Sequence, residues 1–263
     1  MATSQHLVAI HNNLEKLIDS KIEAMPAGFN KTRFIQNCMT VLQDTKGIEK
    51  CDAVSVARTM LKGAFLGLDF FNKECYAIPY GGQVQFQTDY KGEKKLVKKY
   101  SVRPVKDIYA KLVREGDEFT EEIKDGQQTI HFKPIPFNNG PSIGAFAVVL
   151  FEDGGMMYEA MSAEEIEEVR KNYSKQADGP AWTKSKGEMY KKTVLRRLCK
   201  HIELDFDTIE QARAFEDASD FDMTREPKPA QQSPLNIVEG EYEVIEDESG
   251  EKGELVQGDL LQS

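Results

Sequence analysis

The stretch TIHFKPIPFNNGPSIGAFAVVLFEDGGMMYEAM, residues 129–161, decides the fold class. Three short apolar runs in it are separated by the turn-forming sequences NNGPS (138–142) and EDGG (152–155). Short runs rich in Val, Ile, Phe and Tyr, bounded by Gly, Pro, Asn and Asp, are typical of β-strands. The stretch therefore predicts an antiparallel β-meander, and the apolar face of such a sheet needs helices to cover it.

The first 65 residues predict some of these helices. Apolar residues recur there at helical spacing in one stripe, namely Leu7, Ile10, Leu14, Leu17, Ile18, Ile22 and Met25. The sequence MPAG (25–28) ends this pattern, a second pattern covers residues 34–42, and a third runs from Asp52, a candidate N-cap, to Gly67. Such stripes most often form a core, and an interface between subunits is the alternative. We expect residues 1–65 to be a helical region that also carries oligomer contacts.

Two further patterns complete the predicted core. CYAIPY (75–80) and QVQFQT (83–88) flank Gly81-Gly82 and predict two strands joined by a tight turn. After the meander, Ser162 and Glu165 have the spacing of a capping box and predict a helix over 163–173. A loop at 177–180 and a basic helix follow. The predicted fold class is α+β, with residues 66–219 forming the binding core.

The formal net charge of −10 is concentrated at the C-terminal end. Residues 220–263 hold twelve acidic and three basic residues, a net charge of −9, so residues 1–219 carry about −1. This tail is rich in Pro, Gln, Ser and Glu, a composition that cannot bury enough apolar surface to offset the entropy of ordering. We predict that residues 220–263 form a disordered acidic tail for binding a partner protein.

Simple features disfavour several protein classes. Cys38, Cys51, Cys75 and Cys199 lack zinc-site spacing and predict buried, reduced thiols. No secretory signal opens the sequence. The longest apolar run, residues 143–151, is about half as long as a membrane-crossing helix. We therefore expect a cytoplasmic protein with no membrane partner.

The sequence MYKKTVLRRLCKHI, residues 189–202, holds five basic residues and no acidic one. On a helix, at about 100° per residue, Lys192, Arg196 and Lys200 fall on one stripe with Arg197 beside it. The opposite side is apolar, so the helical wheel predicts that these cations face solvent. Like charges at this spacing repel one another. An anionic partner that follows the helix would turn the repulsion into attraction.

A second basic stretch, DYKGEKKLVKKY, covers residues 89–100. Lys94, Lys95, Lys98 and Lys99 share one arc of its helical wheel, and Leu96, Val97 and Tyr100 share the other side. Residues 83–114 and residues 182–202 each carry a net charge of +6. One such face is commonly a solvated surface, but two faces in a nearly neutral core favour a groove for a phosphodiester backbone. We expect the two faces to meet in the fold.

Aromatic residues beside the basic stretches indicate single-stranded rather than duplex nucleic acid. Trp182 and Tyr90 stand at their N-terminal ends, where bases could stack on them. A lone tryptophan is as commonly a packing anchor. No zinc-finger or helix-turn-helix pattern supports duplex reading. No G-x-G-x-x-G or Walker motif is present, so ATP dependence is not expected.

The acidic runs do not suggest an active site. EEIEE (164–168) and EGDEFTEEIKD (115–125) are typical of surface helices or loops, and the four histidines are far apart. We predict no catalytic site, no cofactor and no dedicated metal site, while Mg²⁺ could still affect assembly or activity. Two alternatives stay open: a metal-dependent nuclease or strand-processing enzyme, and an RNA-binding or structural adaptor protein.

Two blocks of the sequence resemble, in order and spacing, the RecT family of phage single-strand annealing proteins. They are LGLDFFNKECYAIPYGGQVQFQTDYKG (66–92) and GPAWTKSKGEMYKKTVLRRLCKHI (179–202), and the helical SVARTMLKGAFLGL (55–68) matches as well. The resemblance covers roughly residues 30–210. Phe70 stands where the family usually has proline, which affects the local turn alone.

The resemblance implies a fold distantly similar to the Red-beta and Rad52 annealing proteins, with subunits in rings or helical filaments. It implies ATP-independent annealing of complementary strands in phage recombination, with the DNA backbone in a basic groove and the bases exposed. Implied partners are single-stranded and annealed duplex DNA, a phage 5′→3′ exonuclease and a host single-strand-binding protein. By position, Lys73 and Lys91 resemble strand contacts, and the groove lining would be Trp182, Lys191, Lys192, Arg196, Arg197 and Lys200. Lys94, Lys95 and Lys98 join these residues as candidate DNA contacts.

Overall fold

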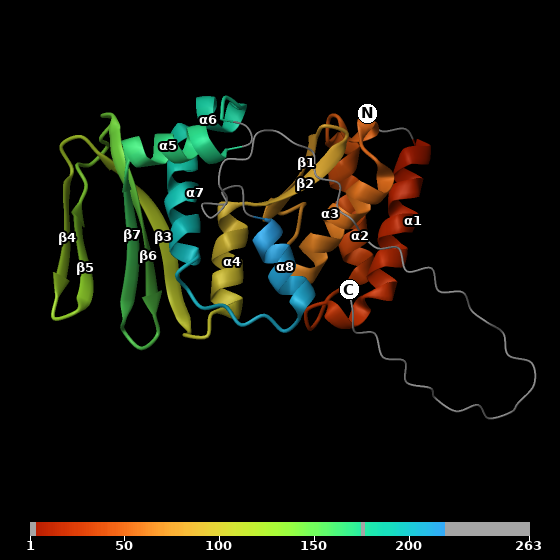
Figure 1. Ribbon diagram of the computed structural model, residues 1–263, viewed down its shortest axis with the longest axis horizontal. Helices are drawn as coiled ribbons and strands as arrows, with labels where there is room; N and C mark the ends of the chain where they lie inside the picture. The colour runs from red at the N-terminus through yellow and green to blue at the C-terminus, as the bar shows by residue number, and fades with distance from the viewer. Residues whose placement is uncertain (1–3, 175–176, 219–263) are drawn as a thin grey trace, which may run out of the picture. The chain divides into compact units, whose positions relative to one another are not determined.

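The computed structural model describes residues 4–174 and 177–218, which lie in one compact unit of the chain (Figure 1). Helices at the N-terminal end, antiparallel strands and further helices make an α+β fold, which confirms the predicted class. The predicted acidic tail, residues 220–263, lies outside the described residues. In the described part of the chain, no helix combines the length and the apolar content that crossing a membrane requires.

The N-terminal region is helical, as predicted. Its elements are α1 (Ser4–Ser20), η1 (Ile22–Ala24), α2 (Lys31–Asp44), η2 (Ile48–Lys50) and α3 (Ala53–Leu66). The apolar stripe of α1 is buried against α3. Asp52 caps α3 as expected, because its side chain accepts a hydrogen bond from the Ser55 N–H at 2.8 Å. The helix ends at Gly67, whose φ of 65° is a left-handed conformation that glycine adopts without strain.

A two-stranded hairpin follows, formed by β1 (Cys75–Tyr80) and β2 (Gln83–Thr88). Gly81 and Gly82 form its turn with φ values of 58° and 81°, the left-handed geometry that a two-residue hairpin turn requires. Val84 and Phe86 face the helical core. The Thr59 hydroxyl on α3 donates a hydrogen bond to the Val84 carbonyl at 2.9 Å, which fixes the hairpin on that helix.

The same hydrophobic core includes a helix from much later in the chain, α8 (Ile209–Asp217). Ala214 is buried in this core, and the Gln211 side chain donates a hydrogen bond to the Ala24 carbonyl at 3.3 Å. The core is therefore continuous across residue 65. The separate roles expected for residues 1–65 and 66–219 stay predictions.

The second part of the fold is a three-stranded antiparallel sheet of β3 (Val105–Arg114), β6 (Ser142–Phe151) and β7 (Met156–Ser162), in the order β3-β6-β7. The two later strands follow the predicted meander. The predicted first strand does not belong to this sheet, so that part of the meander is wrong. The run at 129–133 forms β5 (Gln127–Lys133), which pairs instead with β4 (Glu118–Lys124). Pro134 and Pro136 lack N–H donors, and a loop separates β5 from the sheet.

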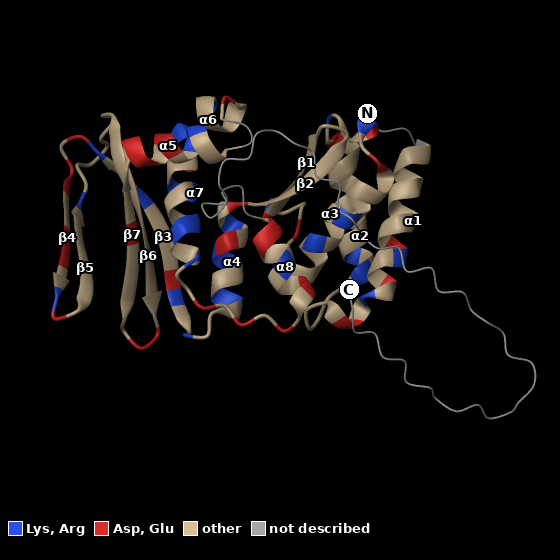
Figure 2. Cartoon of the chain, in the orientation of Figure 1, with Lys and Arg blue, Asp and Glu red and all other residues tan. Residues whose placement is uncertain are grey.

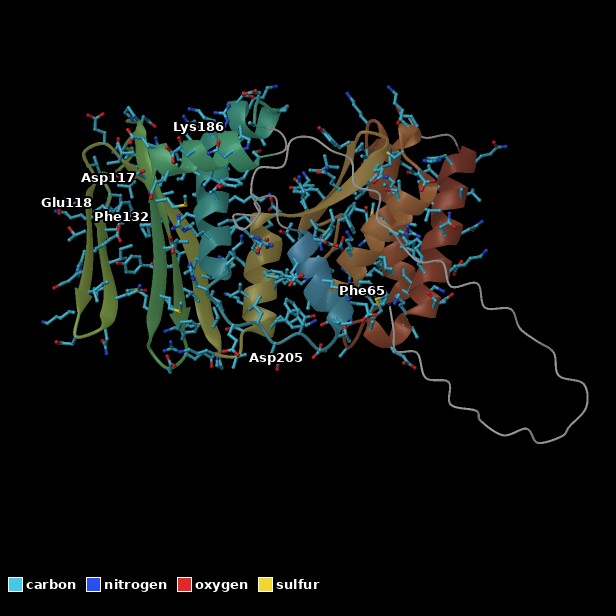
Figure 3. All side chains as sticks on the ribbon, in the orientation of Figure 1. Phe65, Asp117, Glu118, Phe132, Lys186 and Asp205 are labelled. Carbon is cyan, nitrogen blue, oxygen red and sulfur yellow. The ribbon has the colours of Figure 1, made fainter. Side chains whose placement is uncertain are left out.

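The β4–β5 hairpin also corrects the interpretation of residues 115–125 as a helix or loop. Its acidic residues lie on exposed positions, while Phe119 packs inward. Phe119 and Phe132 contact the Phe146 ring at centroid distances of 5.2 and 5.0 Å, so the hairpin covers one face of the sheet (Figure 3). The alternation of side chains explains this, because Phe146 and Val148 point to the hairpin and Ala147 and Val149 to the other face.

Helices cover that other face, namely α4 (Tyr90–Tyr100), α5 (Ala163–Tyr173), α6 (Pro180–Lys184) and α7 (Lys186–Cys199). α7 packs on all three strands and also against α4. The predicted capping box is present at the start of α5: the Glu165 N–H donates to the Ser162 hydroxyl at 3.1 Å, and the Ser162 N–H donates to the Glu165 carboxylate at 2.8 Å.

Candidate nucleic-acid interface

α4 builds a basic surface that is open to solvent. We call its five lysines, Lys91, Lys94, Lys95, Lys98 and Lys99, the lysine face of α4. All five are half or fully exposed, while Leu96, Val97 and Tyr100 on the opposite side are buried. Asp89 caps the helix, with its side chain accepting from the Lys91 N–H. The helical wheel therefore predicted correctly which side of α4 faces solvent and which side is buried.

Acidic residues of neighbouring elements hold three of these lysines. Lys98 and Lys94 approach the Asp107 carboxylate on β3 at 3.3 and 3.9 Å. Lys95 donates to Glu74 at 2.7 Å and to the Gly67 carbonyl at 2.8 Å. Exposed ion pairs of this kind contribute roughly 0.2–1 kcal/mol each. A phosphate group can therefore replace the carboxylates at little cost.

The pKa of Asp107 reflects these contacts. Partial burial raises it, but a hydrogen bond from the Ile108 N–H and the nearby Lys98 and Lys94 outweigh burial and hold the pKa below its ordinary value. Lys99 shows the opposite effect. Burial lowers its pKa, the Asp207 carboxylate opposes this, and the neighbouring Lys95 lowers it further. Like charges thus crowd along this helix.

The loop before β1 brings Lys73 beside the start of α4. The Glu74 carbonyl accepts a hydrogen bond from the Asp89 N–H at 2.9 Å and lies against Gly92, where a Cβ would approach it to 2.1 Å. Lys73 and Lys91 therefore project from adjacent segments. Both are exposed and neither has an ion-pair partner among residues 4–174 and 177–218. Lys73 has a φ of 57°, an uncommon conformation for a residue with a side chain.

The basic residues of α7 are less accessible than the sequence predicts. Lys200, the C-cap of the helix, is exposed, and Lys192 is half-buried. Lys191 pairs with Glu188 at 2.7 Å, and Arg197 pairs with Glu159 on β7 at 2.7 Å. These four side chains stay candidate contacts. Figure 2 shows acidic residues between the cations of α4.

Arg196 does not face solvent, so its predicted orientation is wrong. Only 5% of the residue is exposed, and its side chain forms an ion pair with Glu93 of α4, which is fully buried. Its guanidinium also donates to the Phe215 carbonyl at 3.1 Å and stacks over the Phe215 ring at 4.5 Å. The Thr88 hydroxyl is hydrogen-bonded to the same Glu93 carboxylate. Arg196 thus joins α4, α7 and α8 in the interior.

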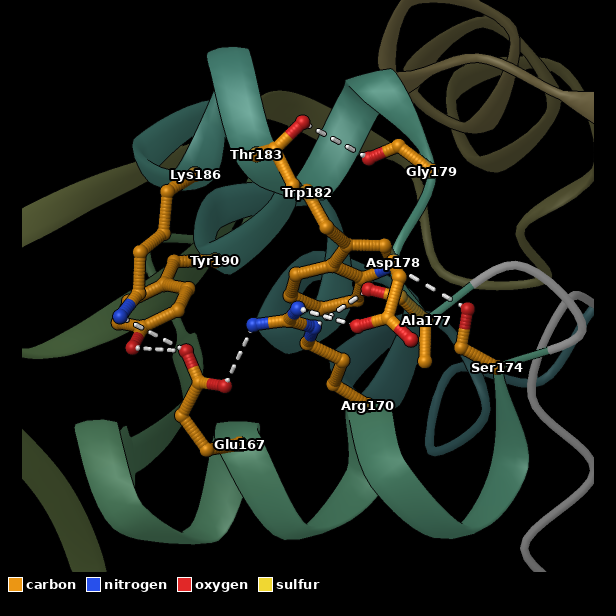
Figure 4. A network of polar contacts seen from close by, with 10 residues as sticks. All are labelled: Glu167, Arg170, Ser174, Ala177, Asp178, Gly179, Trp182, Thr183, Lys186 and Tyr190. Carbon is orange, nitrogen blue, oxygen red and sulfur yellow. Dashed lines mark hydrogen bonds and ion pairs between the residues drawn. The ribbon is translucent and has the colours of Figure 1, made fainter.

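Trp182 is a packing anchor in this structure, and the expectation that its ring lines a groove is wrong. Only 2% of the residue is exposed. Its indole N–H donates to the Ser174 hydroxyl at 3.1 Å, and the Arg170 guanidinium lies over its ring at 5.6 Å (Figure 4). Glu167 completes this network by accepting from Arg170 at 3.0 Å and from the Tyr190 hydroxyl at 2.8 Å.

The two basic helices lie side by side but do not form one uniform cationic surface. The contact between them includes the buried Glu93–Arg196 pair. Lys94 and Lys98 turn to Asp107 on β3, whereas Arg197 turns to Glu159 on β7. Because β3 and β7 are opposite edges of the sheet, the exposed cations of α4 and α7 diverge. The two basic helices are therefore in contact, as expected, but their exposed cations do not form one continuous surface.

Sequence reasoning missed the carboxylates that organise this surface. Glu93 is the one acid inside α4, after the capping Asp89, and its place on the buried side of the helical wheel is the signal that could have identified it. Asp107 on β3 and Glu159 on β7 lie outside the two basic helices, and no local pattern points to them. Among the described residues, no group of three His, Cys, Asp or Glu side chains is placed to hold a metal ion.

Comparison with known proteins supports the family resemblance of residues 66–92 and 179–202. The model of the RecT family matches residues 32–230. The protein RecT of Escherichia coli K12 is 28% identical to this chain over 233 residues, which cover 85% of this chain and 82% of that protein. The match includes α4, the loop that carries Lys73, and α7. Because the family model spans well over half of the sequence, the chain belongs to the RecT family.

Proposed function

We propose that this protein binds single-stranded DNA through the lysine face of α4, together with Lys73, and anneals complementary strands without ATP. Membership of the RecT family implies single-strand annealing in recombination. The observation that supports the binding surface most strongly is the lysine face itself, five cations on one helix, of which Lys94 and Lys98 pair with the half-exposed and therefore exchangeable Asp107 carboxylate. Lys191, Lys192, Arg197 and Lys200 are proposed as secondary contacts.

The mechanism follows from binding by charge alone. A strand held by its phosphates keeps its base edges free, so a second strand can pair with it and supply the specificity. Each phosphate that a lysine neutralises releases counterions, which makes the affinity depend on salt concentration. Annealing then requires concentration and alignment of two strands, and no step needs bond cleavage.

We further propose that many copies act together in rings or helical filaments. RecT-family proteins act on DNA and oligomerise. Linked binding sites raise the overall affinity for a long strand, since each later contact is intramolecular. Weak contacts in each subunit are then sufficient. A phage 5′→3′ exonuclease and a host single-strand-binding protein are proposed partners, and the acidic tail is a proposed attachment point for them.

An annealing assay with fluorescently labelled complementary oligonucleotides tests the proposed function. The protein should accelerate annealing in buffer that contains EDTA and no nucleotide. Lys94→Ala with Lys98→Ala should slow it severalfold, because two phosphate contacts are lost. The control, Lys16→Ala with Lys46→Ala, removes the same charge from the helical region and should have little effect.

Two outcomes would contradict the proposal. One is annealing no faster than in buffer alone. The other is shortening of labelled DNA when Mg²⁺ is added, which would indicate the nuclease alternative. Equal rates of annealing with DNA and RNA oligonucleotides would instead favour a broader nucleic-acid adaptor.

A further inference from the structure

The β1–β2 hairpin presents a face to solvent that none of the contacts above uses. The strand register places Tyr76 opposite Gln87, Ile78 opposite Gln85, and Tyr80 opposite Gln83. Side chains of directly paired residues share a face of the sheet. The other three pairs contain the buried Cys75, Val84 and Phe86 and face the helical core. We call Tyr76, Ile78, Tyr80, Gln83, Gln85 and Gln87 the outward hairpin face.

Two aromatic rings on this face are open to solvent. Tyr80 is 55% exposed and Tyr76 is 37% exposed. Tyrosine is favoured in strands, so a single exposed ring needs no explanation. Here two rings lie four residues apart on one strand, about 13 Å at the usual rise. That distance is about four base steps of a stacked strand, so each ring would contact a different base.

The chemistry of the outward hairpin face differs from that of the β4–β5 hairpin. None of its six residues is charged. The solvent-facing pairs of β4–β5 include Glu118 opposite Lys133, which form an ion pair at 3.1 Å, and Glu122 opposite Thr129. A face that serves solubility alone is usually charged. Exposed aromatic rings are instead the groups on which bases stack in proteins that bind single strands.

Cations stand at one end of this face. The Glu74 carbonyl accepts from the Asp89 N–H at 2.9 Å, which closes the open end of the hairpin, and Lys73 and Lys91 lie next to this pair in sequence, at the end of the face that carries Tyr76. Neither lysine has an ion-pair partner in the described part of the chain. Partial burial, and then the nearby Asp89 carboxylate, raise the pKa of the Tyr76 phenol, so its ring stays neutral.

We propose that the outward hairpin face is a base-stacking platform. Tyr76 and Tyr80 each stack on one base of a single strand whose phosphates Lys73 and Lys91 hold. Stacking uses the flat face of a base and leaves its pairing edge free, so it is compatible with annealing and independent of sequence. The inference rests on the proposed function and adds a second mode of contact to it.

Abasic oligonucleotides separate stacking from charge, because they keep the phosphates and lack the bases. Binding is measured by fluorescence anisotropy with a thymidine oligonucleotide and an abasic strand of equal length. Tyr76→Ala with Tyr80→Ala should weaken thymidine binding at least about fivefold per ring and leave abasic binding unchanged. Tyr76→Phe with Tyr80→Phe keeps both rings and should bind as the wild type does. Lys73→Ala with Lys91→Ala should weaken both strands equally.

The platform is refuted if the alanine variants lose the same affinity for both strands or lose none. It is also refuted if they change the oligomeric state without an effect on thymidine binding, which would assign the face to subunit contacts. Tyr80→Ala alone, at the more exposed position, serves if the double variant does not fold. Failure of the wild type to bind either strand would overturn the proposed function. If the lysine substitutions weaken binding as expected and the tyrosine substitutions have no effect on affinity, the base-stacking platform alone is overturned.

Discussion

Single residues of the candidate site are decided by tertiary contacts that no helical wheel contains. Arg196 and Arg197 are adjacent in sequence and equally basic, yet one is buried against Glu93 and the other is half-exposed beside Glu159. The difference arises because α8 covers the side of α7 that carries Arg196. The sequence predicts that α7 is basic and amphipathic, but it cannot predict which cation a distant helix covers.

Replacement of Arg196 by alanine should therefore affect folding before DNA binding. The change leaves Glu93 buried without its partner, which costs about 3–5 kcal/mol. Arg197→Ala, the matched control on the exposed side, should cost less than about 1 kcal/mol. Urea unfolding measures both values.

A double variant makes this test sharper. Glu93→Leu with Arg196→Met removes both charges, so it should recover most of the stability that Arg196→Ala loses. The structural role would be contradicted if Arg196→Ala left the free energy of unfolding unchanged and weakened the salt dependence of DNA binding. That result would show that Arg196 contacts the DNA.

At the level of the element, α4 acts as a cationic surface that its neighbours partly neutralise. Asp107 engages Lys94 and Lys98 together. Asp107→Asn frees both, so it should tighten single-strand binding about 1.5- to 5-fold, the equivalent of roughly 0.2–1 kcal/mol. Fluorescence anisotropy at moderate salt measures the change. Unchanged or weaker binding would show that these lysines do not meet the strand.

The pH dependence of these ion pairs follows from the lowered pKa of Asp107. A carboxyl group whose pKa is lowered by folding stabilises the folded protein fully at any pH above its pKa in the unfolded chain, which is about 3.9 for aspartate. This stabilisation is lost as the pH falls through the lower pKa that the group has in the folded protein. Asp107 therefore stays charged between about pH 5 and pH 8. The ratio of the Asp107→Asn affinity to the wild-type affinity should be constant over that range, and a ratio that changes there would assign the effect to another group.

The junction between α4 and the Lys73 loop is a second property of this element. A Cβ on Gly92 would approach the Glu74 carbonyl to 2.1 Å, which neither backbone segment can accommodate without moving. Gly92→Ala should destabilise the protein by about 1–3 kcal/mol, despite the better helix propensity of alanine. Gly187→Ala in α7 is the control, since the nearest atom there is the end of the flexible Leu112 side chain. Thermal denaturation that ranks the two variants in the opposite order would contradict this geometry.

Helices whose first residues carry a capping pattern were predicted correctly. Strands that depend on pairing with a distant segment were not. The capping box at Ser162 and the cap at Asp52 give the starts of α5 and α3, because both signals are local. β4 was missed because its acidic residues outnumber its apolar ones, and it becomes a strand by pairing Phe119 with Phe132 of β5. Strand pairing is not local, which is also why the predicted meander contained one wrong strand.

The whole molecule combines a helical core that carries the β1–β2 hairpin with a sheet that is covered by helices on one face and by a hairpin on the other. The lysine face of α4 lies where these parts join, since Leu96 belongs to the first core and Val97 to the second. The sequence could predict the fold class, the basic helices and the family resemblance. It could not predict that α4 and α7 turn their charges to opposite edges of the sheet, because that depends on the strand order.

The salt dependence of single-strand binding tests most directly whether α4 holds the DNA backbone. The triple variant Lys91→Ala, Lys94→Ala and Lys98→Ala is compared with Lys16→Ala, Lys46→Ala and Arg58→Ala, a matched loss of three exposed charges from the helical region. In a plot of log affinity against log salt concentration, the α4 variant should have a slope shallower by about 2, which corresponds to three phosphates at about 0.7 each. The control slope should equal that of the wild type. Equal slopes for all three proteins, or a shallower slope in the control alone, would place the DNA backbone elsewhere.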